Sequence, residues 1–115
     1  MGPIDDLYDR GVAHKNDGNY DDAVIDFREI LNLDPSHAAA HRQLGLVYGF
    51  MGLFDESIEE LQTAVELDSD DTNARNDLAL TYAMLGMVEE AKSHFLAVLT
   101  ADPENQVAKK NLTYF

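Results

Sequence analysis

The sequence contains no cysteine, few basic residues and no long apolar segment. The absence of cysteine excludes both disulfide bonds and thiolate metal sites. No apolar run approaches the length of a membrane span, and the first residues lack the basic and apolar regions of a secretory signal. We therefore expect a cytoplasmic protein, although a secreted protein from which the signal has been removed would have the same composition.

Basic residues are outnumbered by acidic ones, 8 against 22, so the formal net charge is −14. Such a surface repels phosphate, which argues against nucleic acid and against anionic membranes as partners. Two explanations of the acidity remain open. The acids form a docking face for a basic partner, or they form a solvated surface that serves solubility or a salty cytoplasm.

The chain repeats itself with a fixed period. Leu44, Tyr48 and Gly52 have counterparts 34 residues downstream, at Leu78, Tyr82 and Gly86, and a weaker copy lies upstream around Gly18. A period of this size is typical of helical repeat arrays. With 45% apolar residues, the pattern predicts one folded domain over residues 1–115, with repeats at about 4–37, 38–71 and 72–105 and a helix at 106–115.

Each repeat reads as two helices joined by a glycine turn. The helix at about 37–51 ends at Gly52, because glycine tolerates the left-handed backbone that helix ends favour. Paired acids begin the second helix of each repeat, where the helix dipole favours negative charge: Asp21 and Asp22, Asp55 and Glu56, Glu89 and Glu90. At Asp34-Pro35 and Asp102-Pro103 we expect the aspartate to be the N-cap of the following helix.

With this pattern the chain resembles the tetratricopeptide repeat family, over nearly its whole length. The second repeat carries these residues of the family pattern: Leu44, Gly45, Tyr48, Gly52, Phe54, Leu61 and Ala64. The third carries Leu78, Ala79, Tyr82, Gly86, Ala91, Phe95 and Pro103, and the first carries Gly11, Gly18, Tyr20, Ala23, Phe27 and Pro35. The resemblance implies an all-α, right-handed superhelical array of three helix-turn-helix repeats plus a short C-terminal capping helix.

The two ends of the array differ in polarity. Residues that would pack on a preceding repeat are polar in the first one, namely Asp6, Arg10, Asp17 and Asn19. Burying unpaired charge is costly, so the first repeat reads as a true N-terminal end. The last helix, by contrast, leaves its outer side unfinished. It is a short cap, which we favour, or the chain has been cut from a longer protein.

The resemblance also implies which surface carries function. In this family the first helices of the repeats line a concave face. One subgroup grips the C-terminal carboxylate of heat-shock chaperones with Lys, Asn, Asn, Lys and Arg. The corresponding residues here do not match, and the last of them would repel a carboxylate: Tyr8, Val12, Gln43, Asn73 and Asp77. The chain is therefore not expected to act as such a co-chaperone.

The concave face is instead apolar in its centre. Val12, Leu46 and Leu80 occupy one position in the three repeats, and Phe50 and Met84 extend the stripe by one helical turn. The predicted partner-binding residues are these five together with polar ones that flank them: Tyr8, Lys15, Arg42 and Asn76. An apolar stripe of this kind suits an extended peptide or an amphipathic helix. Alternatively, these residues pack between the repeats.

We therefore predict a non-catalytic protein–protein interaction scaffold whose partner is a protein or peptide. The alternative is a structural module that self-associates, as a homo-oligomer, or that belongs to a larger multidomain protein. No nucleophile motif or glycine-rich loop indicates an enzyme or a cofactor. His37 and His41 share a helix face but lack a third ligand, so we do not expect a metal site. His41 is expected to fill a large-residue position, and His94 to lie on the surface.

Overall fold

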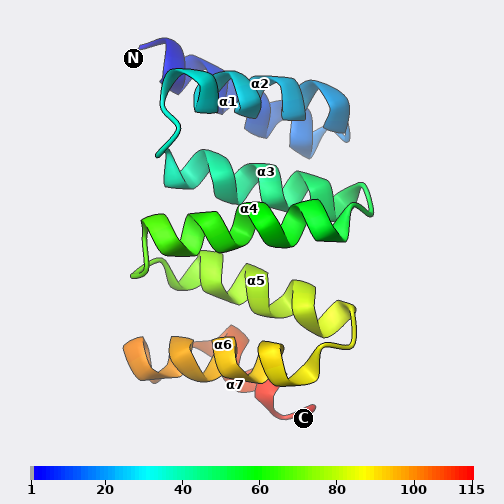
Figure 1. Cartoon of the computed structure of the whole chain (residues 1–115), viewed down its shortest axis with the longest axis vertical. Coiled ribbons are helices and arrows are strands. Elements are labelled where there is room, and N and C mark those ends of the chain that lie inside the picture. The colour runs from blue at the N-terminus through cyan, green and yellow to red at the C-terminus, as the bar shows by residue number, and fades with distance from the viewer. Residues whose placement is uncertain (1) are drawn as a thin grey trace.

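The computed structural model describes residues 2–115, which form an array of antiparallel helix pairs (Figure 1). The helices are α1 (Pro3–Asn16), α2 (Tyr20–Leu33), α3 (Ala38–Phe50), α4 (Phe54–Leu67), α5 (Thr72–Met84), α6 (Val88–Ala101) and α7 (Gln106–Leu112). This confirms the predicted all-α array of three helix-turn-helix repeats with a short final helix. Among these residues, no helix is both long and apolar enough to cross a membrane.

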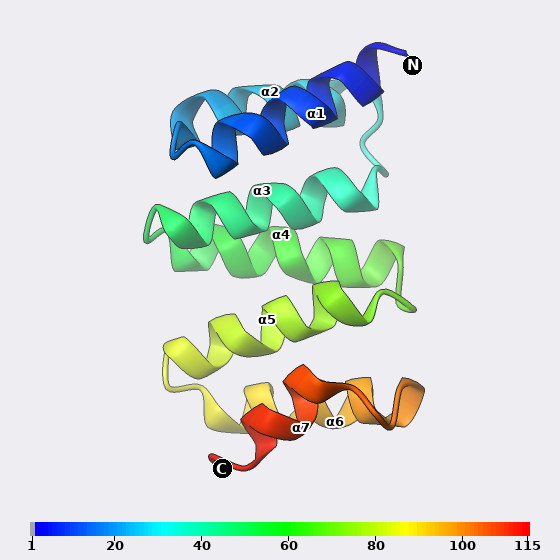
Figure 2. The same cartoon turned by 180° about the vertical axis from the view of Figure 1, so that it is seen from behind.

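The helices form two layers. Figure 1 looks onto α2, α4 and α6, whereas the opposite view in Figure 2 looks onto α1, α3, α5 and α7. We call these the B-helix face and the A-helix face. Each helix contacts the next one along the chain, and α1 and α5 each also contact α3. The first helices of all three repeats therefore lie side by side, which places their outward side chains on one continuous surface.

Glycine makes the turn inside each repeat. Gly52 has a φ of +78°, and Gly18 and Gly86 adopt the same left-handed conformation. A side chain at these positions would strain the backbone, so the period of the glycines sets the period of the turns.

The links between repeats differ from the prediction. Asp34 ends α2 with extended backbone angles rather than capping the next helix. His37 is the N-cap of α3, and its Nδ1 accepts a hydrogen bond from the Ala40 N–H at 3.0 Å. The link without a proline has the same form, since Asp68 ends α4 with similar angles and Asp71 is the N-cap of α5. The three-residue step between the two caps therefore belongs to the repeat and does not depend on the Asp-Pro pair. At α7 the cap is likewise Asn105 and not Asp102.

The core is built from the same positions in each repeat. Phe27, Leu61 and Phe95 are 34 residues apart, and each is fully buried. Small residues on the facing helix make room for them: a Cβ added to Gly45 would lie 2.7 Å from Leu61 Cγ. One buried cluster joins the first two repeats and a second joins the rest of the array.

The ends of the array have the contrasting character that the sequence indicates. All four polar residues of the N-terminal end are exposed: Asp6, Arg10, Asp17 and Asn19. Arg10 donates hydrogen bonds from Nε (3.1 Å) and Nη2 (2.8 Å) to the buried carboxylate of Asp26. At the other end, α7 stops at Leu112 rather than continuing through residue 115. The ring of Phe115 instead lies 6.3 Å from that of Phe95.

Candidate functional site

The A-helix face holds an apolar pocket between α3 and α5, with a volume of about 220 Å³. Its walls include four of the predicted partner-binding residues, Leu46, Phe50, Leu80 and Met84. Phe50 and Met84 are 60% and 65% exposed. The remaining wall residues are Gly49, Ser57, Asp77 and Thr81.

Packing holds the pocket walls in place. The Phe50 ring stacks on Tyr20 at the start of α2, with the ring centroids 5.7 Å apart. Leu80 is half-buried and packs against the core of the second and third repeats. The inner side of the stripe therefore packs between repeats, and its outer side remains exposed.

A polar cluster lies next to the pocket and draws on α1, α3 and α5. Lys15 Nζ donates to Gln43 Oε1 at 2.7 Å, and Gln43 Nε2 donates to the Tyr8 hydroxyl at 3.1 Å. Arg42 Nε donates to Asp77 Oδ2 at 2.6 Å. Because Asp77 also lines the apolar pocket, the cluster and the pocket are parts of one surface.

Burial shifts the titration of two groups in this cluster. It raises the pKa of Asp77 above its ordinary value, and the hydrogen bond and charge of Arg42 act in the opposite direction. It lowers the pKa of Lys15, and the nearby charge of Arg42 lowers it further. Both groups therefore carry their charge in a surrounding that partly excludes water.

One predicted site residue, Asn76, lies deeper than the others. Asn76 is 4% exposed, and its Nδ2 donates to Asn105 Oδ1 at 3.0 Å, linking α5 to the start of α7. Val12 is half-buried against the core of the first two repeats. We leave Asn76 out of the proposed contact surface, because the start of α7 covers it.

Gln43 and Asp77 are the functional candidates that sequence reasoning missed. From the sequence, these two residues were considered only because they do not match the chaperone-binding positions of the family. A usable signal was present, since both occupy one position of the period and so face the same side of the array. The repeat pattern does not predict which of these polar side chains form hydrogen bonds with one another.

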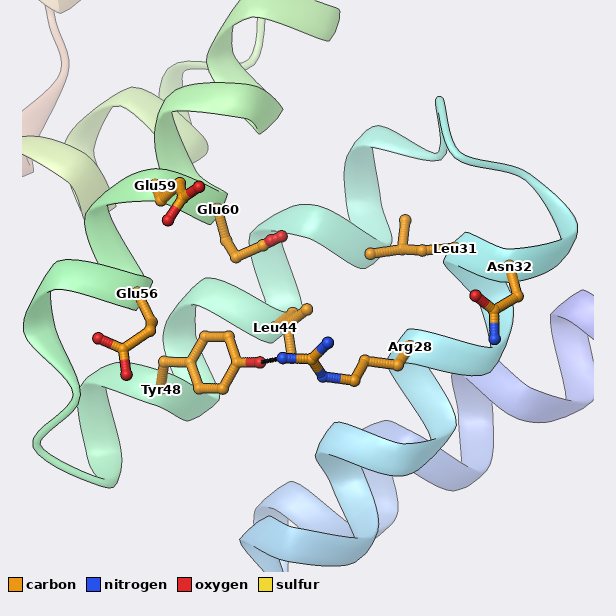
Figure 3. Close-up of a pocket in the computed structure, with 8 residues that line it drawn as sticks. All are labelled: Arg28, Leu31, Asn32, Leu44, Tyr48, Glu56, Glu59 and Glu60. Carbon is orange, nitrogen blue, oxygen red and sulfur yellow. Dashed lines mark hydrogen bonds between the residues drawn. The ribbon is translucent and has the colours of Figure 1, made fainter.

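The B-helix face has a different pocket, of about 300 Å³, between α2, α3 and α4 (Figure 3). Arg28 lies over the Tyr48 ring, 5.8 Å from its centroid, and donates a hydrogen bond to its hydroxyl. Glutamates of α4 form the opposite wall: Glu56, Glu59 and Glu60.

This pocket recurs one repeat later. There, Gln62 Nε2 donates to the Tyr82 hydroxyl at 2.6 Å, beside a cavity of about 240 Å³. Since Gln62 and Tyr82 stand 34 residues after Arg28 and Tyr48, the two cavities are the same junction between repeats. We interpret them as a consequence of repeat packing.

The histidines serve packing. His41 lies between Glu60 Oε1 (3.2 Å) and the Pro35 carbonyl (2.8 Å), with a side chain that is 13% exposed. The expectation that His94 lies on the surface is wrong. It is half-buried and stacks on Tyr82 at 5.6 Å, because the A helix of its own repeat covers it, and burial lowers its pKa. Within residues 2–115, no group of His, Asp and Glu side chains is suited to holding a metal ion.

The repeated helix pairs, glycine turns and junctions define a helical repeat protein. Family models described as tetratricopeptide repeats match residues 4–37 and 72–105, and one described as a TPR repeat matches residues 51–86. Together they cover well over half of the sequence. The chain belongs to the tetratricopeptide repeat family.

Several solved structures share this fold over nearly the whole length of the chain. The first TPR domain of Spaghetti (RPAP3), bound to the HSP90 peptide SRMEEVD, has a TM-score of 0.91 and 23% identity, with 96% of this chain and 88% of that chain covered. The Arabidopsis OM64 TPR domain has a TM-score of 0.90 and 18% identity, with coverage of 98% and 96%. The second TPR domain of human RPAP3, in complex with the HSP70 peptide SGPTIEEVD, has a TM-score of 0.89 and 24% identity, with coverage of 98% and 97%. No curated protein sequence matches the chain significantly.

Proposed function

We propose that this protein is a non-catalytic interaction module that binds a peptide segment of another protein on its A-helix face. The observation that carries the proposal is the pocket between α3 and α5, in which Phe50 and Met84 remain largely exposed. Large apolar side chains on a folded surface favour contact with a partner, because burying them removes apolar area from water. Methionine and aromatic residues are frequent anchors in such contacts.

The similar structures support a peptide as the ligand class. The Spaghetti domain and the second human RPAP3 domain each hold a short peptide. At their level of identity they share the fold with this chain, so the identity of their peptides is not transferred. For this chain we propose a segment that presents an apolar side chain to the pocket, either as an extended strand or as an amphipathic helix.

The test is a screen of peptides displayed on phage against the purified protein. We expect selected peptides to share apolar residues, and we expect the double variant Phe50→Asp/Met84→Asp to lose at least about tenfold in affinity. Both side chains are mostly exposed, so the fold should survive the change, and circular dichroism checks the helix content. The matched control is Ile25→Asp, an equally exposed apolar position on α2 (63%).

Two results would count against peptide binding on this face. Peptides that bind the double variant as well as the wild type would place the site elsewhere. A concentration-dependent increase in molar mass that disappears in the double variant would favour the structural alternative, in which two copies cover each other's pockets. Light scattering across concentrations distinguishes the two functions.

A further inference from the structure

The charges beside the pocket do not balance. Each of the three A helices contributes one charged side chain to the cluster: Lys15 from α1, Arg42 from α3 and Asp77 from α5. Arg42 and Asp77 form an ion pair with 2.6 Å between Nε and Oδ2. Lys15 donates a hydrogen bond to the neutral amide of Gln43. Within residues 2–115, Lys15 forms no ion pair. The cluster therefore carries a net charge of +1 in a chain whose net charge is −14.

The position of Lys15 makes its free charge costly. Lysine side chains usually keep the ammonium group in water while the methylene stem packs. Here the group is half-buried and its pKa is lowered, first by burial and then by the charge of Arg42, whereas the charge of Asp77 acts in the opposite direction. An amide oxygen can accept its hydrogen bond but cannot neutralise its charge. Asp77 is already paired with Arg42, so a further carboxylate placed beside Lys15 would balance the remaining positive charge.

Packing of the repeats does not require this lysine. The positions that correspond to Lys15 in the second and third repeats are Gly49 and Ala83, both of which lack a polar side chain. The junctions on the B-helix face, by contrast, repeat their tyrosine hydrogen bond at both places. A charged group that the period does not demand and that burial disfavours is a candidate for ligand recognition.

We propose that the peptide bound on the A-helix face places an apolar side chain in the pocket and one Glu or Asp carboxylate on Lys15. This inference rests on the proposed function and specifies its partner. The net charge of −14 repels an acidic ligand as a whole. The rest of the peptide is accordingly neutral or basic, and its one carboxylate sits beside the positive charge that the Arg42–Asp77 pair leaves over.

The ligand differs from the chaperone C-terminus that the family's clamp holds. The clamp positions carry no cation here, and one of them carries Asp77. The structure shows that Arg42 neutralises Asp77, which lowers the repulsion expected from the sequence. Lys15 lies outside the clamp positions, so its contact with a carboxylate is separate from the clamp.

The experiment uses a scanning set of short peptides, in helical and in extended forms, each with two apolar residues. Each neighbouring position in turn carries Glu, Gln or Lys, and affinities are measured by fluorescence anisotropy at physiological salt. At one position we expect Glu to bind about fivefold to tenfold more tightly than Gln, and Lys to bind more weakly than either. We expect Lys15→Met to remove the preference for Glu while leaving the Gln peptide bound, and Lys110→Met, an exposed lysine on α7, to preserve it.

A second measurement follows Lys15 directly. Nitrogen-15 chemical shifts of the lysine side chains report their titration, and the Glu peptide should raise the pKa of Lys15 whereas the Gln peptide should not. Equal affinity for Glu and Gln peptides at all positions would overturn the carboxylate contact but leave peptide binding intact. A Glu preference that survives Lys15→Met would overturn it as well. If no peptide of the set and no displayed peptide binds, the proposed function fails with it.

Discussion

The two faces of this array each have a pocket of similar size, but the pockets have different origins. On the B-helix face the pocket recurs at both junctions, with a hydrogen bond to Tyr48 in one and to Tyr82 in the other. On the A-helix face, three charged side chains from three helices meet once. Features that repeat with the period are explained by the packing of each repeat on the next. The charged cluster of the A-helix face does not repeat, so repeat packing does not explain it. We propose that it serves binding.

The largest predicted effect tests the core on which both faces depend. Phe95→Ala removes a fully buried ring, so we expect the free energy of unfolding to fall by about 3–5 kcal/mol. The neighbouring Leu96→Ala is the control, because Leu96 is 52% exposed and its loss should cost less than about 0.5 kcal/mol. Urea unfolding followed by circular dichroism measures both. Equal losses would mean that the third repeat is packed differently from this structure.

The second prediction tests whether the B-helix junctions are equivalent. Tyr48→Phe and Tyr82→Phe each remove one hydroxyl hydrogen bond, and we expect each to lower the free energy of unfolding by about 1 kcal/mol. Neither should alter peptide affinity, since both hydroxyls lie on the other face from the proposed site. A loss of affinity in Tyr48→Phe alone would show that the junction with Arg28 takes part in binding.

The smallest predicted effect concerns Lys15. Most substitutions lower the free energy of unfolding, whereas we expect this one to raise it. Lys15→Met removes a half-buried cation, so we expect the free energy of unfolding at neutral pH to rise by about 0.5 kcal/mol or less, since solvent screens such a charge. The folded-state pKa of Lys15 lies below its unfolded value. The destabilisation of the folded state by the Lys15 charge is therefore present below the folded-state pKa. It disappears as the pH rises through that pKa toward the unfolded-state pKa.

The measurement for this prediction is urea unfolding of wild type and Lys15→Met from neutral to alkaline pH. The advantage of the variant should shrink with rising pH, and Lys110→Met should show no such trend. A variant that is less stable than wild type at neutral pH would mean that the hydrogen bond from Lys15 to Gln43 outweighs the cost of burial. Lys15 would then be a structural residue.

The sequence was sufficient to predict the turns inside the repeats and the apolar stripe of the A-helix face, although it misplaced the caps at Asp34 and Asp102. The 34-residue spacing of glycines such as Gly52 predicted the turns, because only glycine adopts their left-handed backbone without strain. Apolar spacing placed Leu46, Phe50, Leu80 and Met84 on one surface, and the four indeed line one pocket. These predictions depend on local geometry, which repeats with the chain.

The tertiary structure decided what happens between helices that are distant in sequence. Arg42 and Asn76 share one position of the period, yet Arg42 reaches Asp77 on the A-helix face whereas Asn76 is covered where α7 begins. Lys15 meets Gln43 across 28 residues. Such pairings depend on the distance and angle between neighbouring repeats and on where the array stops, and no spacing within a single helix encodes them.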